Sequence, residues 1–450
     1  MRIVDLAELR VAIWGLGREG RAALAALHKR LPDLQVTLFC NPVEAAGFVT
    51  QPSIRLVTEA ATAADLSNFD IVIKSPGISD YRIELIEAQR NGTRFTSGTA
   101  LWFAENPDAR VVAVTGTKGK STTSALIAHL LRGLGHRVAL AGNIGLPLLD
   151  LLDQESDFWV VELSSYQTRS AGEVELAVVT NVEQEHLDWH GSRERYVDDK
   201  LALIDKARSV LVGNDRPPLF ERVARHPKAQ VAGADGGWQL SGSAICRNGY
   251  EQLQRSDLKL PGMHNAQNLC LALTALDLLG EDAAQSLAAV ASFRPLPHRL
   301  TELGESEGLR WIDDSISTTP QSTVQALASL HGESVIVLVG GYERGLDYAA
   351  LIEHVAIHAP RAMVTMGTNG ARIANALRDS NATGHIHETS TLAEAVSCAR
   401  GFAKQGDVIL LSPGAPSFDQ FTDYAERGRA FARMAGCESG PETIVGLGIA

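Results

Sequence analysis

The chain has 450 residues, of which 45% are hydrophobic and 21% are charged. It is too long for one compact core, and its composition is that of an ordinary globular protein rather than a disordered one. The net charge of −12 excludes a broad nucleic-acid-binding surface, because such a surface has to be basic.

Cysteine usage and hydropathy point to a cytoplasmic protein. The five cysteines are scattered and form no CxxC pair, so we expect reduced thiols rather than a zinc site or a disulfide framework. The first residues form no apolar signal region, and no run of about 18 uncharged apolar residues follows. We therefore expect no membrane insertion.

The first block of the chain begins with an apolar strand at residues 11–14. It continues with Gly15-Leu16-Gly17-Arg18-Glu19-Gly20 and an alanine-rich helix to about Arg30. A dinucleotide-binding loop requires a carboxylate at the end of the second strand, which here ends Phe39-Cys40-Asn41. NAD is therefore disfavoured, and the glycines are left to contact the phosphates of another nucleotide or to form a plain tight turn.

The second block carries the strongest motif. The apolar strand 111–114 leads into Gly116-Thr117-Lys118-Gly119-Lys120-Ser121-Thr122 and a helix. Backbone N–H groups of such a loop surround phosphate oxygens, Lys120 can reach the outer phosphates, and the Ser121 hydroxyl can hold Mg²⁺. The strict phosphate-loop pattern has a glycine where this chain has Val114, so a simple glycine-rich turn is the alternative.

Polar residues follow the next strands of this block. Glu162 ends an apolar run, and His186 lies in the segment Thr180–His190, 14 residues before Lys200. A carboxylate at the carboxyl end of a parallel strand can bind Mg²⁺. A solvated glutamate and a surface histidine are the plain alternatives. Asn268 begins a helix, where it can contact an adenine or simply cap the helix.

The third block starts after the proline-rich residues 294–298, which we interpret as a boundary. Strands are predicted at 334–339, 362–366 and 407–411, with helices between them. Strands that alternate with helices predict parallel sheets covered by helices, and therefore an α/β fold.

Taken together, these motifs resemble the Mur ligase family, and within it the glutamate-adding MurD type. The resemblance covers nearly the whole chain and rests on GTKGKST, ELSSYQ, TNVEQEHLD with Lys200, GMHNAQN, PLPHRL, DDS and LLSPGAPSFDQF. It implies three domains: a Rossmann-like UDP-sugar-binding domain at 1–106, a central P-loop ATPase domain with a parallel sheet at 107–298, and a Rossmann-like amino-acid-binding domain at 299–450.

The resemblance also implies a reaction in which ATP phosphorylates the carboxylate of UDP-N-acetylmuramoyl-L-alanine and the amine of glutamate displaces the phosphate. Lys120, His186, Lys200 and His298 would be catalytic. ATP would contact Gly116, Thr117, Lys118, Gly119, Lys120, Ser121, Thr122, Asn268, Arg299 and Asp314. Two Mg²⁺ ions would be held by Ser121 and Glu162, and by His186 with a carbamylated Lys200. The UDP-sugar would contact Gly15, Leu16, Gly17, Ser75 and Asn143, and glutamate would contact Thr318, Arg344, Ser417 and Tyr424.

Departures from the family pattern gather around the incoming amino acid. Ile316 stands where the D-glutamate enzymes have a lysine, and Arg344 replaces another lysine. Lysine is a point charge and arginine a planar fork, so these changes alter carboxylate recognition. A variant branch of the family adds L-glutamate, which we therefore expect here; D-glutamate is the alternative.

Three rival functions are weighed against this one. A folylpolyglutamate synthase would lack the first nucleotide-binding block. A dinucleotide-dependent oxidoreductase is opposed by the missing ribose carboxylate and by the phosphate loop. A catalytically inactive regulator is opposed by Lys120, Glu162, His186 and Lys200. We expect a monomer.

Overall fold

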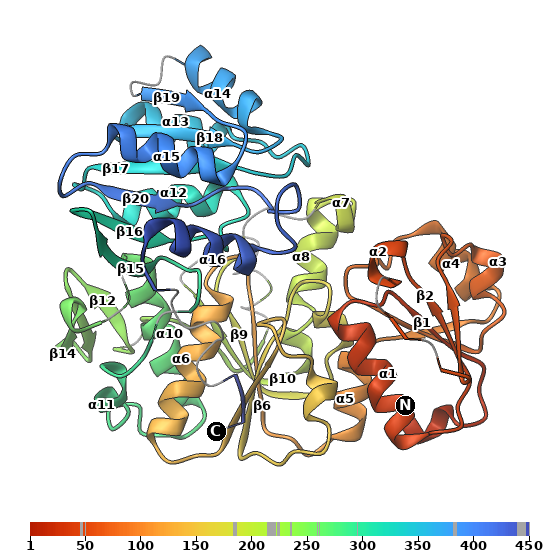
Figure 1. Ribbon diagram of the computed structural model, residues 1–450. Helices are drawn as coiled ribbons and strands as arrows, with labels where there is room; N and C mark the ends of the chain where they lie inside the picture. Colours follow the sequence, from red (N-terminus) through yellow and green to blue (C-terminus); the bar gives the residue numbers. More distant parts are fainter. Residues whose placement is uncertain are drawn as a thin grey trace. The chain divides into compact units, whose positions relative to one another are not determined.

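The computed structural model describes residues 1–45, 48–49, 51–182, 187–213, 222, 226–234, 236–258, 260, 262–294, 296–380, 385–438 and 447–449. The chain forms two compact units. Figure 1 labels the helices and strands. Unit 1 comprises Met1–Leu258, Ala266–Phe293 and Gly446–Ala450, and unit 2 comprises Lys259–Asn265 and Arg294–Val445. Among the described residues, no helix combines the length and the apolar character needed to cross a bilayer.

The first sheet of unit 1 has five parallel strands in the order β3-β2-β1-β4-β5. The strands are β1 (Val11–Trp14), β2 (Val36–Phe39), β3 (Ile54–Val57), β4 (Ile71–Lys74) and β5 (Arg94–Thr96). The helices are η1 (Ile3–Leu6), α1 (Arg18–Arg30), α2 (Pro42–Ala45), α3 (Ala63–Leu66), α4 (Ile83–Arg90) and α5 (Gly98–Glu105). All residues of β1 and β4 are buried, as expected for short apolar strands that are covered on both faces. The strand order reverses between β1 and β4, which places the loops after these two strands at the switch point where ligands bind.

The second sheet has seven strands in the order β11-β10-β9-β6-β8-β7-β21, of which only β21 is antiparallel to its neighbour. The strands are β6 (Val111–Thr115), β7 (Val138–Gly142), β8 (Phe158–Glu162), β9 (Val174–Val179), β10 (Ala207–Val212), β11 (Ala229–Val231) and β21 (Gly448–Ile449). The helices are α6 (Lys120–Gly133), η2 (Leu148–Leu151), η3 (Thr168–Ser170), α7 (Leu187–His190), α8 (Arg193–Leu201), η4 (Ile204–Lys206), η5 (Arg255–Asp257), α10 (Met263–Leu278) and α11 (Leu287–Val290). A small antiparallel sheet follows, with β12 (Gln239–Ser241), β13 (Ala244–Arg247) and β14 (Tyr250–Gln254).

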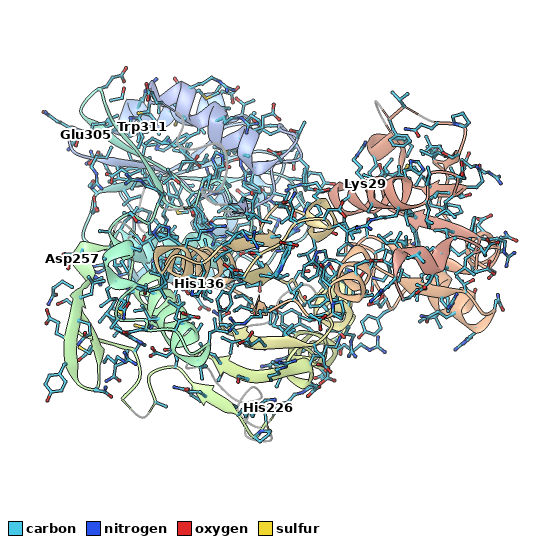
Figure 2. The ribbon with its side chains drawn as sticks, turned by 90° about the horizontal axis from the view of Figure 1, so that it is seen from below. Lys29, His136, His226, Asp257, Glu305 and Trp311 are labelled. Carbon is cyan, nitrogen blue, oxygen red and sulfur yellow. The ribbon has the colours of Figure 1, made fainter. Side chains whose placement is uncertain are left out.

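One apolar core runs through the first two sheets. The same cluster of buried side chains contains Val11 of β1 and Val111 of β6. Trp102 of α5 is fully buried, and its ring centroid lies 4.6 Å from that of Trp159. At the surface, Lys29 of α1 pairs with Asp153 at 2.5 Å (Lys29 is labelled in Figure 2). These contacts explain why the two sheets form a single unit.

Unit 2 contains a six-stranded sheet in the order β15-β16-β20-β17-β18-β19, parallel except for β15. The strands are β15 (Thr301–Ser306), β16 (Leu309–Asp313), β17 (Val335–Gly340), β18 (Ala362–Met366), β19 (His385–Glu388) and β20 (Val408–Leu411). The helices are α12 (Pro320–Ser329), α13 (Ala349–Ile357), α14 (Gly370–Asp379), α15 (Leu392–Phe402) and α16 (Tyr424–Ala435).

Helices cover both faces of this third sheet. Side chains of α12, α13 and α14 pack into the apolar cluster on one face, and those of α15 and α16 pack into the cluster on the other. Trp311 of β16, labelled in Figure 2, is fully buried against Phe431 of α16. The predicted α/β class with parallel sheets is confirmed. The predicted domain boundaries, after residues 106 and 298, stay predictions.

Candidate active site

The phosphate loop lies between β6 and α6, as predicted, and two of its glycines are required by their surroundings. Gly116 has φ +145°, and a Cβ atom on it would lie 1.9 Å from Thr180 Oγ1. Gly119 has φ +77°, and its Cβ would lie 2.6 Å from Asn268 Oδ1. Both φ values lie in the region that favours glycine. The structure therefore brings the loop and Asn268 together, and the ATP contacts predicted for both stay predictions.

Asn181, which follows β9, and Lys200 of α8 form hydrogen bonds to the loop. The amide N–H groups of Thr117 and Lys118 donate to Asn181 Oδ1, at 3.1 and 2.7 Å. Lys200 Nζ donates to the carbonyl oxygen of Gly116 at 2.6 Å. Lys120 Nζ donates to the carbonyl oxygen of Thr117 at 2.8 Å, so in this structure its ammonium caps its own loop. The contact of Asn181 was not predicted, although its place directly after a buried strand is a usable signal.

Glu162 is the buried carboxylate of the site. It ends β8 beside β6, where it pairs in register with Val114, and it is 1% exposed. Oε1 accepts a hydrogen bond from Asn143 Nδ2 at 2.7 Å, whereas Oε2 has no partner among the described residues. A buried carboxylate oxygen without a donor is costly unless a cation pairs with it.

The donor set suits Mg²⁺. Ser121, in the first turn of α6, offers a hydroxyl oxygen, and Glu162, at the end of β8 beside β6, offers a carboxylate oxygen. In the described part of the chain, no three His, Cys, Asp or Glu side chains gather as a metal cluster. Mg²⁺ at nucleotide sites takes one or two carboxylates and completes its shell with phosphate and water, so a larger cluster is unnecessary. His186, predicted to support a second ion, lies outside the described residues.

Asp199, next to Lys200 on α8, is the centre of a buried network that the sequence did not predict. It is 1% exposed and accepts hydrogen bonds from His190 Nδ1 at 2.6 Å, from Tyr81 Oη at 3.0 Å and from Arg169. His190 Nε2 in turn bonds Ser165 Oγ at 3.0 Å. Burial alone would raise the pKa of Asp199, but the bonds from His190 and Arg169 outweigh burial and hold this pKa below its usual value.

The loops at the switch point of the first sheet also meet. Ser75 Oγ donates to the carbonyl oxygen of Gly15 at 3.0 Å, and a Cβ on Gly15 would lie 2.7 Å from Ser75 Oγ. The side chain of Leu16 is 1% exposed, so only its backbone can face a ligand. Asn143, predicted with Ser75, contacts Glu162 of the second sheet, and its predicted contact with the UDP-sugar stays a prediction. The two regions are joined by Arg18, which donates to the carbonyl oxygen of Gly145 at 3.3 Å.

In unit 2, His298 is held in an unusual backbone conformation beside Asp313. His298 has φ +58°, and Leu300 two residues later has φ +46°. Left-handed conformations at residues other than glycine cluster at functional sites. His298 Nδ1 bonds Asp313 Oδ2 at 2.6 Å. A Cβ on Gly428 would lie 2.1 Å from His298 Nδ1, so helix α16 needs glycine at that position.

Asp314 is buried, and both of its carboxylate oxygens accept hydrogen bonds from residues of unit 2. It accepts hydrogen bonds from Ser317 Oγ at 2.5 Å, from Ser412 Oγ at 2.7 Å and from the backbone N–H of Leu300 at 3.2 Å. Burial outweighs these bonds and raises the pKa of Asp314 to about 6. Arg299 is close enough to oppose this shift electrostatically. The nucleotide contacts predicted for Asp314 and Arg299 stay predictions.

The segments predicted to bind glutamate are tied to one another at the switch point of the third sheet, between β17 and β20. The backbone N–H of Tyr342 donates to the carbonyl oxygen of Pro416, and that of Gly414 to the carbonyl oxygen of Ser317, both at 2.8 Å. These bonds connect the loops that carry Arg344, Ser417 and Thr318. Arg344 is exposed and Ser417 is buried.

Two residues of α16 complete this region. The ring of Tyr424 lies 6.1 Å from that of His298. Arg427, which was not predicted, is 1% exposed, and its guanidinium donates to the carbonyl oxygens of Ser315 and Ala415 at 2.8 and 3.0 Å. Its partners are more than ten residues away in the chain, so no local pattern could have identified it.

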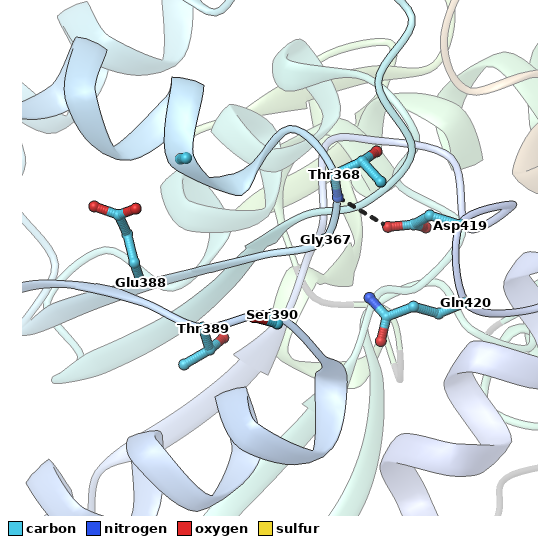
Figure 3. Close-up of a pocket in the computed structure, with 8 residues that line it drawn as sticks. Gly367, Thr368, Glu388, Thr389, Ser390, Asp419 and Gln420 are labelled. Atoms are coloured by element: carbon cyan, nitrogen blue, oxygen red, sulfur yellow. Dashed lines mark hydrogen bonds between the residues drawn. The ribbon is translucent and has the colours of Figure 1, made fainter.

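A cavity of about 430 Å³ lies at the ends of β18 and β19, farther along the sheet from this switch point. Its lining residues are Gly367, Thr368, Ala371, Glu388, Thr389, Ser390, Asp419 and Gln420. Figure 3 shows the Asp419 carboxylate accepting a hydrogen bond from the backbone N–H of Thr368, at 3.2 Å. The N–H of Leu392, at the start of α15, is bonded to Gln420. No predicted site residue lines the cavity, and we assign it no ligand.

Comparisons with known proteins agree with this geometry. Residues 114–276 match the Mur ligase middle domain, and residues 298–414 match the Mur ligase, glutamate ligase domain. The chain is 47% identical to the UDP-N-acetylmuramoyl-L-alanine--L-glutamate ligase of Xanthomonas axonopodis pv. citri (strain 306), with 100% of both chains covered.

Two solved structures share the fold. The UDP-N-acetylmuramate-alanine ligase MurC from Thermotoga maritima matches with a TM-score of 0.62 and 21% identity, over 95% of this chain and 99% of that one. The MurF ligase from Thermotoga maritima in complex with ADP matches with a TM-score of 0.60 and 16% identity, over 95% of each chain.

Proposed function

This chain belongs to the Mur ligase family of ATP-dependent ligases, and from that premise we propose that it joins L-glutamate to UDP-N-acetylmuramoyl-L-alanine in peptidoglycan synthesis. The observation that carries the proposal is the glycine-rich loop 116–122 between β6 and α6 with the buried Glu162 on the neighbouring strand, together with an amino acid region in which Ile316 and Arg344 replace lysines. The full-length similarity to a ligase named for L-glutamate supports it.

The proposed reaction has two steps. The γ-phosphoryl group of ATP passes to a carboxylate oxygen of the substrate alanine, giving an acyl phosphate and ADP. The glutamate amine then attacks the acyl carbon, the carbon–oxygen bond to phosphate breaks, and the amine loses a proton. Phosphoryl transfer depends on positioning and charge neutralisation, which the loop residues 116–122 can supply through backbone N–H groups and Lys120. Lys120 would exchange its bond to Thr117 for one to phosphate oxygens.

Ser121 and Glu162 would hold the first Mg²⁺, and His186 with a carbamylated Lys200 the second. When bound, Mg²⁺ neutralises charge on the phosphates and on the transferring group. Lys200 is 2% exposed, and its Nζ already points at the loop through the carbonyl oxygen of Gly116. Carbamylation would begin with loss of a proton from the Nζ ammonium; the neutral amine then adds CO₂ and releases a second proton, which turns this side chain into an oxygen ligand.

The Lys200 assignment has its own test. Lys200→Ala should lose ligase activity, and bicarbonate or a short-chain carboxylate should restore part of it by replacing the missing carboxylate. A folded Lys200→Ala protein with wild-type turnover would remove Lys200 from the metal site.

The preference for L-glutamate follows from the cationic groups of the pocket. The amine must lie about 3–3.5 Å from the acyl carbon for productive attack. Inverting the α-carbon with the amine in place moves at least one carboxylate, so its charged partner must move as well. Isoleucine at 316 and arginine at 344 are changes of that kind, and Thr318, Ser417 and Tyr424 can supply further hydrogen bonds. A lost charge partner costs about 2–5 kcal/mol, enough for a strong preference.

The decisive experiment supplies D- and L-glutamate in equal amounts with ATP, Mg²⁺ and UDP-N-acetylmuramoyl-L-alanine, and analyses the chirality of glutamate in the hydrolysed product. We expect L-glutamate to predominate. Ile316→Lys combined with Arg344→Lys restores the usual lysines and should shift the product toward D-glutamate. Predominant D-glutamate from the wild-type chain would refute the stereochemical proposal, and absence of ATP-dependent product would refute the proposed substrate pair.

A further inference from the structure

Helix α8 presents two adjacent faces to two different parts of unit 1. Residues four apart share a face of a helix, so Tyr196 pairs with Lys200, and Arg195 pairs with Asp199. Tyr196, Asp199 and Lys200 are all buried. The two pairs are offset by one residue, or about a quarter of a turn, and they therefore reach different neighbours.

The Tyr196 and Lys200 face contacts the phosphate loop. Tyr196 Oη and Thr117 Oγ1 lie 2.7 Å apart, and Lys200 Nζ donates to the carbonyl oxygen of Gly116 at 2.6 Å. Both contacts fall on the first two residues after β6. The position of α8 therefore helps to determine the position of the phosphate loop and of its backbone N–H groups.

The Arg195 and Asp199 face contacts the loop after β4, six residues beyond Ser75. Tyr81 Oη donates to Asp199, and the Arg195 guanidinium lies 4.6 Å from the centre of the Tyr81 ring. The same loop is held by Trp189, whose indole N–H donates to the carbonyl oxygen of Pro76 at 3.1 Å. The predicted UDP-sugar loop is thus joined to α8 by side-chain contacts.

Asp199 also forms hydrogen bonds with residues outside the loop after β4. Besides Tyr81, its carboxylate accepts from His190 and Arg169, and its backbone carbonyl accepts from Thr168 Oγ1 at 2.6 Å. His190 extends the network to Ser165, three residues after Glu162. Burying a carboxylate is costly unless its oxygens are paired, and here the partners Tyr81, His190 and Arg169 come from three separate segments.

We propose that α8 couples the UDP-sugar loop to the phosphate loop, and that Asp199 is the positioning residue of this coupling. Asp199 is not among the residues predicted to contact nucleotide or sugar, and its carboxylate partners are protein side chains. It fixes α8 against Tyr81 on one side, so that Lys200 and Tyr196 meet the phosphate loop on the other. This inference rests on the proposed function, because it takes Ser75 and the phosphate loop to be parts of one ligase site.

Asp199→Asn tests the proposal, because it keeps the shape and removes the charge. We expect the KM for UDP-N-acetylmuramoyl-L-alanine and the KM for ATP each to rise about 10-fold, the loss typical of one hydrogen bond to a charged group. The KM for glutamate should stay within about 2-fold, because its predicted residues belong to unit 2. The matched control is Asp198→Asn, one residue earlier, where the side chain is 64% exposed and pairs with Arg222.

Tyr81→Phe is the second variant, for use if Asp199→Asn does not fold. It removes only the hydroxyl group that donates to Asp199. It should raise the same two KM values, and the double variant should be no worse than Asp199→Asn alone, since both changes break one linkage. The inference is overturned if folded Asp199→Asn matches the Asp198→Asn control in all KM values, or if Tyr81→Phe leaves both KM values unchanged. A wild-type chain without ligase activity would count against the proposed function instead.

Discussion

Gly119→Ala is the most informative single change in the phosphate loop. Alanine at φ +77° costs about 1–2 kcal/mol of backbone strain. In addition, the new Cβ would lie 2.6 Å from Asn268 Oδ1, a distance that real Cβ atoms essentially never show, so the Asn268 amide has to turn away. If Asn268 contacts the nucleotide, the lost hydrogen bond is worth about 1–3 kcal/mol, which is about a 5- to 150-fold loss of ATP affinity.

The same helix offers a matched control. Gly135, just beyond the carboxyl end of α6, has φ +93°, and no atom lies within 4 Å of a Cβ placed on it. Gly135→Ala therefore carries the backbone strain without the clash. Both variants should lose thermal stability, measured as Tm, with the larger loss for Gly119→Ala because of its clash, whereas only Gly119→Ala should lose affinity for a non-hydrolysable ATP analogue in calorimetry.

A second comparison isolates the clash. In the Gly119→Ala background, Asn268→Ala should cost little further ATP affinity, because the contact is already lost. If Gly119→Ala binds the analogue as tightly as Gly135→Ala does, the reasoning is wrong and Asn268 does not serve the nucleotide from its position beside Gly119.

Three further changes probe other parts of the site. Lys120→Ala should abolish ATP-dependent phosphate release and leave Tm nearly unchanged, because it removes the positive charge that would neutralise the transferring phosphoryl group. A folded variant that stays active would contradict the assignment of this loop to phosphate binding. Glu162→Gln keeps an acceptor for Asn143 but removes the carboxylate, so Mg²⁺ with ATP should no longer raise Tm as it does in the wild-type chain. Asp314→Asn addresses pH: since the folded pKa of Asp314 is raised from 3.8 to about 6, the stability contributed by its protonation is complete below pH 3.8 and is lost as pH rises through about 6. The Tm of Asp314→Asn minus the Tm of the wild-type chain should therefore increase between pH 3.8 and about 6 and stay constant above that pH. A difference in Tm that does not change with pH would contradict the raised pKa.

Local sequence patterns were sufficient for several strands, among them β1, β6 and β18, and for the position of the glycine-rich loop after β6. The run at 111–114 and the glycines after it predicted β6, the loop and α6, because a buried parallel strand is continuously apolar and a phosphate loop needs glycine. The helix predicted to end at about Arg30 is α1, which ends at Arg30. Periodicity and turn chemistry act over a few residues, and for such features they are enough.

The parts of the site that the sequence did not predict depend on contacts between distant residues. Asn181 bonds the loop from 64 residues away, and Tyr81 reaches Asp199 across 118 residues. No spacing rule connects such pairs, since the fold brings them together. Lys120 illustrates a second limit: its type and position suggest a phosphate contact, but its hydrogen bond to Thr117 appears only in three dimensions.

Strand β21 has a consequence for solubility. β7 lies near the rim of its sheet, and all five of its residues are buried, uncharged and small or aliphatic. A bare strand of that kind readily pairs with the same strand of another molecule and leads to aggregation. Gly448 and Ile449 occupy this rim opposite Leu140 and Ala139, and Arg132 fixes the pairing by donating to the carbonyl oxygen of Gly448 at 3.1 Å. Residues 448–449 therefore protect the β7 edge of the sheet from pairing with another molecule. A tag or deletion that disturbs them should increase aggregation.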